Sequence, residues 1–226
     1  MSRAGAAVVP ADDNSPACTD YVLAAIDAAR TAEHVGPLLL PHNWYRLTIP
    51  EQLFVVTNLE RTARGLLALL GIVPALSHAA ALGAVRNVDP WSSGGIPVRS
   101  MSSILADASP SPLAADYLWL YNDGWGGTRS NTPNIDCTSS VAAGCWGHRL
   151  NILGRGLGPY CHDCQVGVAY RVRAGEGVYT EVFVRPMGRP APMSWTWRRE
   201  IPSLVSAAAP REGRVASTGP AEATSR

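Results

Sequence analysis

The sequence predicts one globular α/β domain in which helices come first and an antiparallel β-hairpin comes last. The 226 residues suffice to bury one sizeable core and are few for two full-sized domains. With 46% hydrophobic and 16% charged residues, the composition is that of an ordinary globular chain. Signals for helix starts recur along the first two thirds of the chain, whereas strand-like alternation follows only after residue 164.

Two helices are predicted before residue 66. Thr19 or Asp20 can cap a first helix, which runs to about His34 and is followed by a loop rich in Leu and aromatic residues. Residues 48–51, Thr-Ile-Pro-Glu, read as a capping box with proline in the first turn. This box starts a second helix that ends at Gly65.

Two further helices are predicted to begin at proline residues. One covers residues 75–87 after Pro74, and the other runs from Ser111-Pro112 to the Asn-Asp-Gly sequence at 122–124. The stretch between them, residues 89–110, consists mostly of turn-forming residues and is predicted as loop.

A short helix and the hairpin complete the predicted fold. The helix spans Gly144 to Leu153, and residues 165–173 and 178–184 alternate about a four-residue turn, as in an antiparallel hairpin. The expected organisation is an N-terminal segment that could be a signal-peptide remnant (1–18), a helix and loop (19–47), the main domain (48–188) and a Pro/Ala/Arg-rich tail that is largely disordered (189–226).

Composition excludes several classes of protein. All 19 basic residues are Arg, which excludes Schiff-base catalysis, the P-loop lysine and Ser–Lys dyads. The formal charge of +1 leaves no surplus positive charge to follow a phosphate backbone, so we expect no nucleic-acid partner. The apolar stretches are far shorter than the roughly 18 residues of a membrane helix, so no membrane span is expected. A G-x-S-x-G elbow does not occur, which disfavours an α/β-hydrolase.

Five cysteines favour an oxidising compartment, and the expected location is extracellular or in the cell envelope. Local pairing would join Cys137 to Cys145 and Cys161 to Cys164. Cys18 would then be left over, although it could displace one of these partners. Two alternatives stay open: a four-thiolate zinc site, for which the spacing is unusual, and a redox-active Cys-x-x-Cys motif at 161–164.

The densest group of chemically competent side chains lies at residues 144–153. His148 and Asn151, three residues apart, share a helix face, and the imidazole could act as acid, base or metal ligand. The competing structural interpretation is a histidine that hydrogen-bonds to a neighbouring backbone group. Asp123 and Gly124, with the residues up to 127, read as turn chemistry.

Two carboxylates are further candidates. Glu60 lies within the well-patterned second helix, and Glu181 shares one face of the last strand with Tyr179. A carboxylate on an apolar face needs a partner. The structural interpretation is an ion pair with an arginine such as Arg61 or Arg149.

Four blocks of the sequence resemble the CAP superfamily of SCP-like extracellular domains, which includes cysteine-rich secretory proteins, venom allergens and plant pathogenesis-related proteins. The blocks are Asn58–Leu66, Gly147–Leu153, Val166–Tyr170 and Tyr179–Phe183. The second block, Gly-His-Arg-Leu-Asn-Ile-Leu, is the most specific and is similar to a motif of bacterial members. The resemblance covers about residues 53–185 and implies a three-layer α/β/α sandwich around an antiparallel sheet.

The sequence also departs from this family. In metal-binding members two His and two Glu line a central cleft, but the first-helix His position is Thr57 here. The G-E-N-[IV] block has no counterpart between Trp91 and Leu113. Of the four ligands only His148 carries over, and one imidazole does not hold zinc tightly.

The four family-like blocks are present, but most of the family's metal ligands are missing. We therefore expect a secreted domain without strong catalysis, which binds a small ligand or a cell-surface partner in a cleft beside His148. The alternative is a hydrolase, metal-independent or weakly metal-dependent, in which His148 and Glu60 or Glu181 form an acid/base pair. No cofactor is expected. The candidate cleft residues are His148, Glu60, Asn151, Glu181 and Tyr179.

Overall fold

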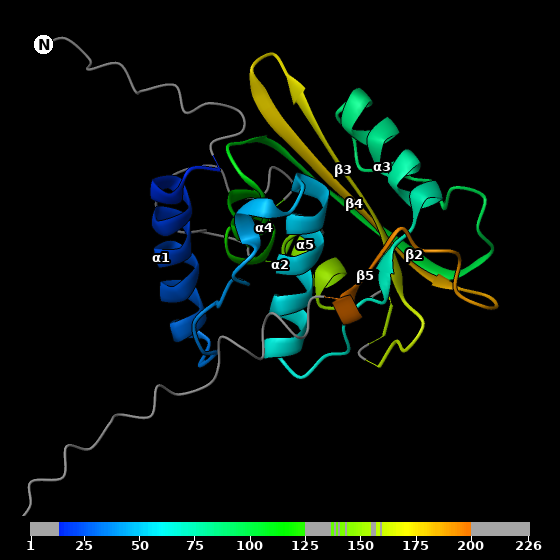
Figure 1. Cartoon of the computed structure of the whole chain (residues 1–226), viewed down its shortest axis with the longest axis horizontal. Helices are drawn as coiled ribbons and strands as arrows, with labels where there is room; N and C mark the ends of the chain where they lie inside the picture. The colour runs from blue at the N-terminus through cyan, green and yellow to red at the C-terminus, as the bar shows by residue number, and fades with distance from the viewer. Residues whose placement is uncertain are drawn as a thin grey trace, which may run out of the picture.

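The computed structural model describes residues 14–124, 137, 139, 141–142, 144–154, 157–158 and 160–199 (Figure 1). The helices are α1 (Pro16–Ala32), α2 (Ile49–Ala63), α3 (Pro74–Arg86), α4 (Pro112–Tyr121) and α5 (Gly147–Ile152), with 3₁₀ turns η1 (Trp44–Arg46) and η2 (Trp197–Arg199). The strands are β1 (Gly71–Ile72), β2 (Val98–Ser109), β3 (Gln165–Arg173), β4 (Glu176–Pro186) and β5 (Trp195–Thr196). No helix of the described part of the chain is long and apolar enough to cross a membrane.

The five strands form one mixed sheet in the order β2-β4-β3-β1-β5. The β2–β4, β3–β4 and β1–β5 pairs are antiparallel, but β1 runs parallel to β3. The expectation of an antiparallel sheet is therefore only partly right. The parallel pair arises because the chain crosses over through α3 between β1 and the rest of the sheet, and a parallel neighbour needs such a crossover.

Helices cover both faces of the sheet. Successive side chains of a strand point to opposite faces, and two neighbours on β4 show this directly. The Thr180 hydroxyl donates to the carbonyl of Ala80 on α3, whereas Glu181 accepts from Thr57 on α2. Figure 1 accordingly places α3 on one side of the sheet and α1, α2, α4 and α5 on the other.

Backbone contact between α3 and the sheet depends on Gly167 of β3. A Cβ at this position would lie 2.1 Å from the backbone carbon of Leu76. The glycine thus allows the helix to approach the strand closely, and it lies in the third of the four family-like sequence blocks.

Three of the five helices follow the sequence prediction. The capping box at Thr48 and Glu51 is present at the start of α2, and α3 and α4 begin at Pro74 and Pro112. The first helix was placed wrongly, since Ser15 rather than Thr19 or Asp20 caps it, with proline at its first position. This is the same Ser-Pro signal that starts α4.

The C-terminal elements differ from the prediction in detail. Helix α5 is shorter than expected because Gly144 and Trp146 adopt positive φ angles (101° and 62°), which are not helical. The hairpin turn contains two residues rather than four, since Arg173 already pairs with Glu176. Ala174 and Gly175 both have positive φ, as a tight hairpin turn requires.

The loop prediction for residues 89–110 is wrong over most of its length, because β2 occupies Val98–Ser109. Four serines and two alanines give this strand little hydrophobic contrast, so it lacks a clear alternating pattern. Strand β5 lies beyond residue 188, where a disordered tail was expected, and pairs with β1. The rest of this tail, residues 200–226, and the segment before residue 14 fall outside the described residues.

Candidate functional site

His148 lies in the first turn of α5, and Asp123 fixes its position. The Asp123 side chain follows α4 and is 1% exposed. Its Oδ2 atom accepts hydrogen bonds from the backbone N–H groups of His148 (2.7 Å) and Arg149 (3.2 Å). These two amides belong to the start of a helix, where N–H groups lack partners within the helix. Asp123 therefore ties the end of α4 to the start of α5.

The same carboxylate also holds the imidazole. Its Oδ1 atom lies 2.8 Å from Nδ1 of His148. A carboxylate only accepts hydrogen bonds, so Nδ1 of His148 carries a proton and donates it to Asp123. The His148 side chain is 23% exposed, which makes it a preorganised and partly accessible imidazole.

A second carboxylate stands on the other side of the ring. Oδ1 of Asp89 lies 4.0 Å from Nε2 of His148, and the Asp89 side chain is 54% exposed. Asp89 belongs to the loop between α3 and β2. The imidazole is therefore flanked by a buried carboxylate at Nδ1 and an exposed one near Nε2.

Trp146 borders this arrangement and depends on a glycine. Its indole ring lies against Gly124, where a Cβ would come within 2.0 Å of the ring. The Trp146 backbone N–H donates to the Asp123 carbonyl (2.8 Å), and the Arg149 guanidinium lies 5.6 Å from the indole ring. The sequence predicts only a turn at Asp123 and Gly124. In the structure these two residues contact His148 and Trp146.

Asn151, the second candidate on this helix, has a structural contact. Its Nδ2 donates to the carbonyl of Ser103 on β2 at 2.9 Å. This hydrogen bond attaches α5 to β2, the edge strand of the sheet. It thereby helps to set the position of His148 relative to the sheet.

Glu60 lies in a buried ion-pair network instead of beside His148. Its Oε2 atom accepts hydrogen bonds from Arg30 of α1 at 2.7 Å and from the Tyr121 hydroxyl at 3.0 Å. Arg64, the C-cap residue of α2, donates to the same oxygen. Glu60 is 0% exposed, so a ligand in solution does not reach it.

Arg149, expected as a partner for a site carboxylate, pairs with Glu33 at the end of α1. The guanidinium lies 2.8 Å from each of the two Glu33 carboxylate oxygens, and Arg64 adds a third contact of 2.8 Å. Burial alone would raise the pKa of Glu33, but the hydrogen bonds from Arg149 and Arg64 outweigh it and hold this pKa below its usual value.

Glu181 lies on the same side of the sheet as α5, but its side chain is hydrogen-bonded to Thr57 of α2. Its two carboxylate oxygens lie 3.1 and 3.0 Å from the Thr57 hydroxyl, and the side chain is completely buried. Desolvation raises the pKa of Glu181 to about 8, although the Thr57 hydrogen bond and the charge of Arg61 oppose the shift. Arg61 itself donates to the carbonyls of Leu67 and Ile152.

Asp116 of α4 is a third buried carboxyl group in this interior. Neither of its oxygens has a hydrogen-bond partner among the described residues. Burial, together with the nearby charges of Glu60 and Glu181, raises the pKa of Asp116 well above its usual value. The raised pKa favours the neutral form of Asp116, which limits the cost of burying three carboxyl groups together.

Thr57, which the sequence resemblance aligns with a histidine of metal-binding CAP members, offers no imidazole and donates its hydroxyl to Glu181. Tyr179 is a core residue whose ring packs on Tyr170 at a centroid distance of 4.9 Å. Of the five sequence candidates, His148 combines a ring fixed by a carboxylate with a side chain that is 23% exposed.

The predicted disulfides are present. Cys137 is bonded to Cys145 and Cys161 to Cys164, and Cys18 belongs to neither disulfide. Within the described residues, the one group of potential metal ligands is Cys161, Asp163 and Cys164, but its sulfur atoms are oxidised to the disulfide. The four-thiolate zinc interpretation is therefore wrong for this structure.

Sequence reasoning missed Asp123, Asp89 and Arg30. Asp123 and His148 are 25 residues apart, and Arg30 and Glu60 are 30 apart. Hydrophobic periodicity does not report contacts of this kind. One signal was available for Asp123, because an aspartate in a turn after one helix is also a frequent cap for another.

Comparison with known proteins does not assign this chain to a family. No protein-family model matches this sequence, and no curated protein matches it. Among solved structures, the chain is similar to a cysteine-rich secretory protein from Staphylococcus aureus subsp. aureus Mu50, with a TM-score of 0.38 and 17% sequence identity. The similarity covers 66% of this chain and 40% of that one.

Proposed function

We propose that this chain is a secreted, CAP-like domain that binds a small ligand at His148, free or displayed on a cell surface, and has no strong catalytic activity. The observation that carries this proposal is the way in which the His148 imidazole is held and exposed. His148 is held through Nδ1 by a carboxylate that is 1% exposed, while its own side chain is 23% exposed. A ring whose orientation is fixed by a buried carboxylate and whose side chain is partly exposed is suited to binding.

The sequence blocks that resemble the CAP superfamily support the domain assignment. The 147–153 block forms α5 and positions His148, and the blocks at 166–170 and 179–183 form β3 and β4. Two disulfides are typical of proteins in oxidising compartments. Weak catalysis follows from the positions of Glu60 and Glu181, both of which are completely buried and hydrogen-bonded elsewhere.

A fragment screen with the full-length, oxidised protein tests this function. Neutral, cationic and anionic compounds are added to ¹⁵N-labelled protein, and backbone amide shifts are recorded. We expect at least one compound to shift the α5 amides in a saturable way, and His148→Gln to abolish this. His162→Gln is the matched control, since His162 is exposed and lies in the Cys161–Cys164 loop. A complete screen without a binder lost in His148→Gln would refute the proposal.

A second candidate, a hydrolase, is favoured by one observation. A carboxylate at Nδ1 orients an imidazole as a general base, as in hydrolytic triads, and Asp123 occupies that position. This pairing replaces the expected partnership of His148 with Glu60 or Glu181. Release of p-nitrophenol from p-nitrophenyl acetate at a rate well above that of free imidazole, lost in His148→Gln, would favour the hydrolase over a binding domain.

A further inference from the structure

We propose that Glu181 controls the attachment of α5 through Arg61: when the buried Glu181 carboxyl group loses its proton to the solvent, the Arg61 guanidinium turns toward it and gives up its hydrogen bond to the end of the helix that carries His148. As a means of regulating the His148 site, this inference rests on the function proposed above. The movement of α5 belongs to the protein alone and can be measured without a ligand.

The Arg61 side chain connects α2 to the end of α5. Its Nε atom donates to the Leu67 carbonyl at 3.0 Å, and its Nη1 atom donates at 2.5 Å to the carbonyl of Ile152, the last residue of α5. The last carbonyl groups of a helix have no partner within the helix, so this bond satisfies one of them. Since Asp123 holds the start of the same helix, Arg61 helps to fix its opposite end.

Arg61 has hydrogen-bonding capacity that these two contacts do not use. The residue is 0% exposed, and its Nη2 atom, which carries two hydrogens, has no hydrogen-bond partner among the described residues. Burial lowers the pKa of Arg61 to about 10, although the charge of Glu181 opposes this shift. The side chain is therefore a buried cation at neutral pH, with donors available for a carboxylate that forms nearby.

Glu181 is the carboxyl group that can supply this charge. It is 0% exposed, accepts from the Thr57 hydroxyl, and has Ile104 and Val168 as its neighbours on the adjacent strands. Such surroundings favour the protonated form, and burial raises the pKa of Glu181 to about 8. The charge of Arg61 acts in the opposite direction, so the two side chains already interact electrostatically.

The other charged groups around Glu181 do not compete for this role. Asp116 of α4 is 0% exposed, and a negative charge on Glu181 raises the pKa of Asp116, so ionisation of Glu181 favours a neutral Asp116. Arg30 of α1 and Arg64 at the C-cap of α2 already bond to Glu60. A single new negative charge therefore arises in this part of the core.

Ionised Glu181 attracts the Arg61 guanidinium more strongly than a carbonyl group does. A guanidinium–carboxylate pair combines hydrogen bonds with charge attraction, which is strong in the low-dielectric interior. Rotation toward Glu181 gives up the bond to the Ile152 carbonyl, while Asp123 still holds the first turn of α5. We therefore expect α5 to loosen from its C-terminal end and the position of His148 to change.

NMR spectra of the full-length, oxidised protein without ligand test this coupling. The Glu181 ¹³Cδ, the Arg61 ¹⁵Nε and the α5 amides are recorded from pH 6 to 9, where Arg61 remains largely a cation. We expect the three sets of signals to change together with a midpoint near pH 8. Exchange of the Leu153 amide, which bonds to the Arg149 carbonyl, should rise about three- to tenfold beyond its intrinsic pH dependence, as expected for the loss of one hydrogen bond.

Three variants identify the group that titrates. Glu181→Gln should abolish the transition at Arg61 and in α5. His148→Gln should retain it, because the imidazole is not its source. Glu33→Gln is the matched control, since Glu33 bonds to Arg149 of α5 but has a pKa held below its usual value, and it should also retain the transition.

The wild-type signals decide the inference even if Glu181→Gln fails to fold. Titration of Glu181 without a change at Arg61 and in α5, or no titration of Glu181 between pH 6 and 9, would overturn it. An α5 transition that remains in a folded Glu181→Gln variant would do the same. None of these results bears on the fragment screen, which alone decides whether His148 binds ligands.

Discussion

The Thr57 hydroxyl lies 3.0 Å from one oxygen of the Glu181 carboxylate and 3.1 Å from the other, and so joins α2 to the central part of the sheet across 124 residues of sequence. Both side chains are completely buried. Glu181 faces Ile104 and Val168 on the neighbouring strands. The hydrogen bond therefore lies in the buried interior between α2 and the sheet.

Thr57→Val should lower the free energy of unfolding by about 1–3 kcal/mol, because it removes the hydroxyl partner of a buried carboxyl group. Valine keeps the shape, so the loss reports the hydrogen bond rather than a cavity. Thr62→Val on the same helix is the matched control. Its hydroxyl bonds to the Asn58 carbonyl of its own helix, and we expect a change within about 0.5 kcal/mol. Equal losses in urea denaturation would contradict this prediction.

Glu181 should make the protein less stable as the pH rises. Its folded-state pKa of about 8 lies above the usual value of 4.5. Between these two values the folded state holds a proton that the unfolded state has released, so stability is full below pH 4.5 and is lost as the pH rises through 8. The expected loss is on the order of a few kcal/mol.

Glu181→Gln isolates this effect, since an amide does not titrate. The difference in unfolding free energy between wild type and Glu181→Gln should shift against the wild type as the pH rises from 5 to 9. Glu33→Gln is the matched control and should show no such trend, because the pKa of Glu33 is lowered and its contribution is lost only at acid pH. A difference that is independent of pH would contradict the raised pKa.

Local sequence signals predicted the helices well, because capping and proline chemistry act within a few residues. The capping box at Thr48 and the proline starts of α3 and α4 depend only on their immediate neighbours. The start of the first helix was predicted wrongly, although its signal is equally local: Ser15 caps the helix and Pro16 follows, before Thr19. Strand β2 could not be recognised, because its burial comes from pairing with β4 rather than from its own serine-rich sequence.

The site was predicted in part. The Gly-His-Arg-Leu-Asn block identified His148, and the structure gives it a fixed, partly exposed ring. Its partner Asp123 was not identified, because that contact depends on how α4 and α5 pack. Glu60 and Glu181 fit the prediction that a carboxylate on an apolar face needs a partner, but those partners are Arg30 and Thr57.

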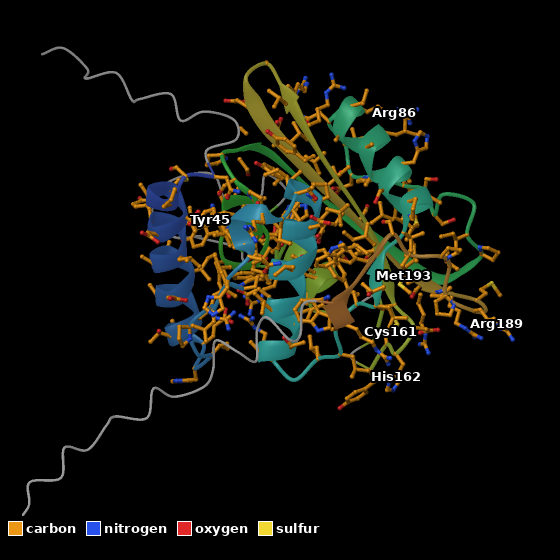
Figure 2. The ribbon with its side chains drawn as sticks, viewed as in Figure 1. Tyr45, Arg86, Cys161, His162, Arg189 and Met193 are labelled. Carbon is orange, nitrogen blue, oxygen red and sulfur yellow. A yellow bond between two sulfur atoms is a disulfide. The ribbon has the colours of Figure 1, made fainter. Side chains whose placement is uncertain are left out.

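Arg30→Met should destabilise the protein by about 3 kcal/mol. Removing one partner of a buried ion pair costs about 3–5 kcal/mol, and the lower value applies because Arg64 and Tyr121 still bond to Glu60. Arg86→Met is the matched control on the exposed surface of α3, labelled in Figure 2, and should change stability by less than about 0.5 kcal/mol.

Denaturation curves of the wild type and of Arg30→Met, which measure this loss, also test the domain organisation. Val22 and Ile26 of α1 belong to the core that also contains Leu53 and Phe54 of α2. We therefore predict one cooperative transition in which α1 and the main domain unfold together. A separate early transition in Arg30→Met, with the rest of the protein unchanged, would instead make residues 19–47 an independent unit.

Reduction of the disulfides should lower the melting temperature visibly. The Cys137–Cys145 bridge spans 8 residues of sequence and contributes about 2–3 kcal/mol by the loop-entropy argument, whereas the Cys161–Cys164 bridge spans 3 and contributes about 2 kcal/mol. Figure 2 shows Cys161 beside His162 in the loop before β3. Double Cys→Ser variants, melted under oxidising conditions, separate the two contributions.

Alkylation of the protein from its native compartment checks the predicted location. One thiol, that of Cys18, should react, because the other four cysteines form disulfides. Cys18→Ser is the control and should leave no reactive thiol. Five reactive thiols would indicate a reducing compartment and contradict secretion.

His148→Ala should separate binding from stability. Three donors bond to the Asp123 carboxylate, and the substitution removes only the imidazole, while the N–H groups of residues 148 and 149 remain. Because the side chain is 23% exposed, water can replace part of the lost contact, and we expect a loss of about 1 kcal/mol. Asp123→Ala removes the acceptor from all three donors and should cost more, about 2–4 kcal/mol. Urea melts of both variants, combined with titration of the compound found in the fragment screen, measure the two effects. A loss above about 2 kcal/mol for His148→Ala with unchanged affinity would make His148 a core residue and remove it from the site.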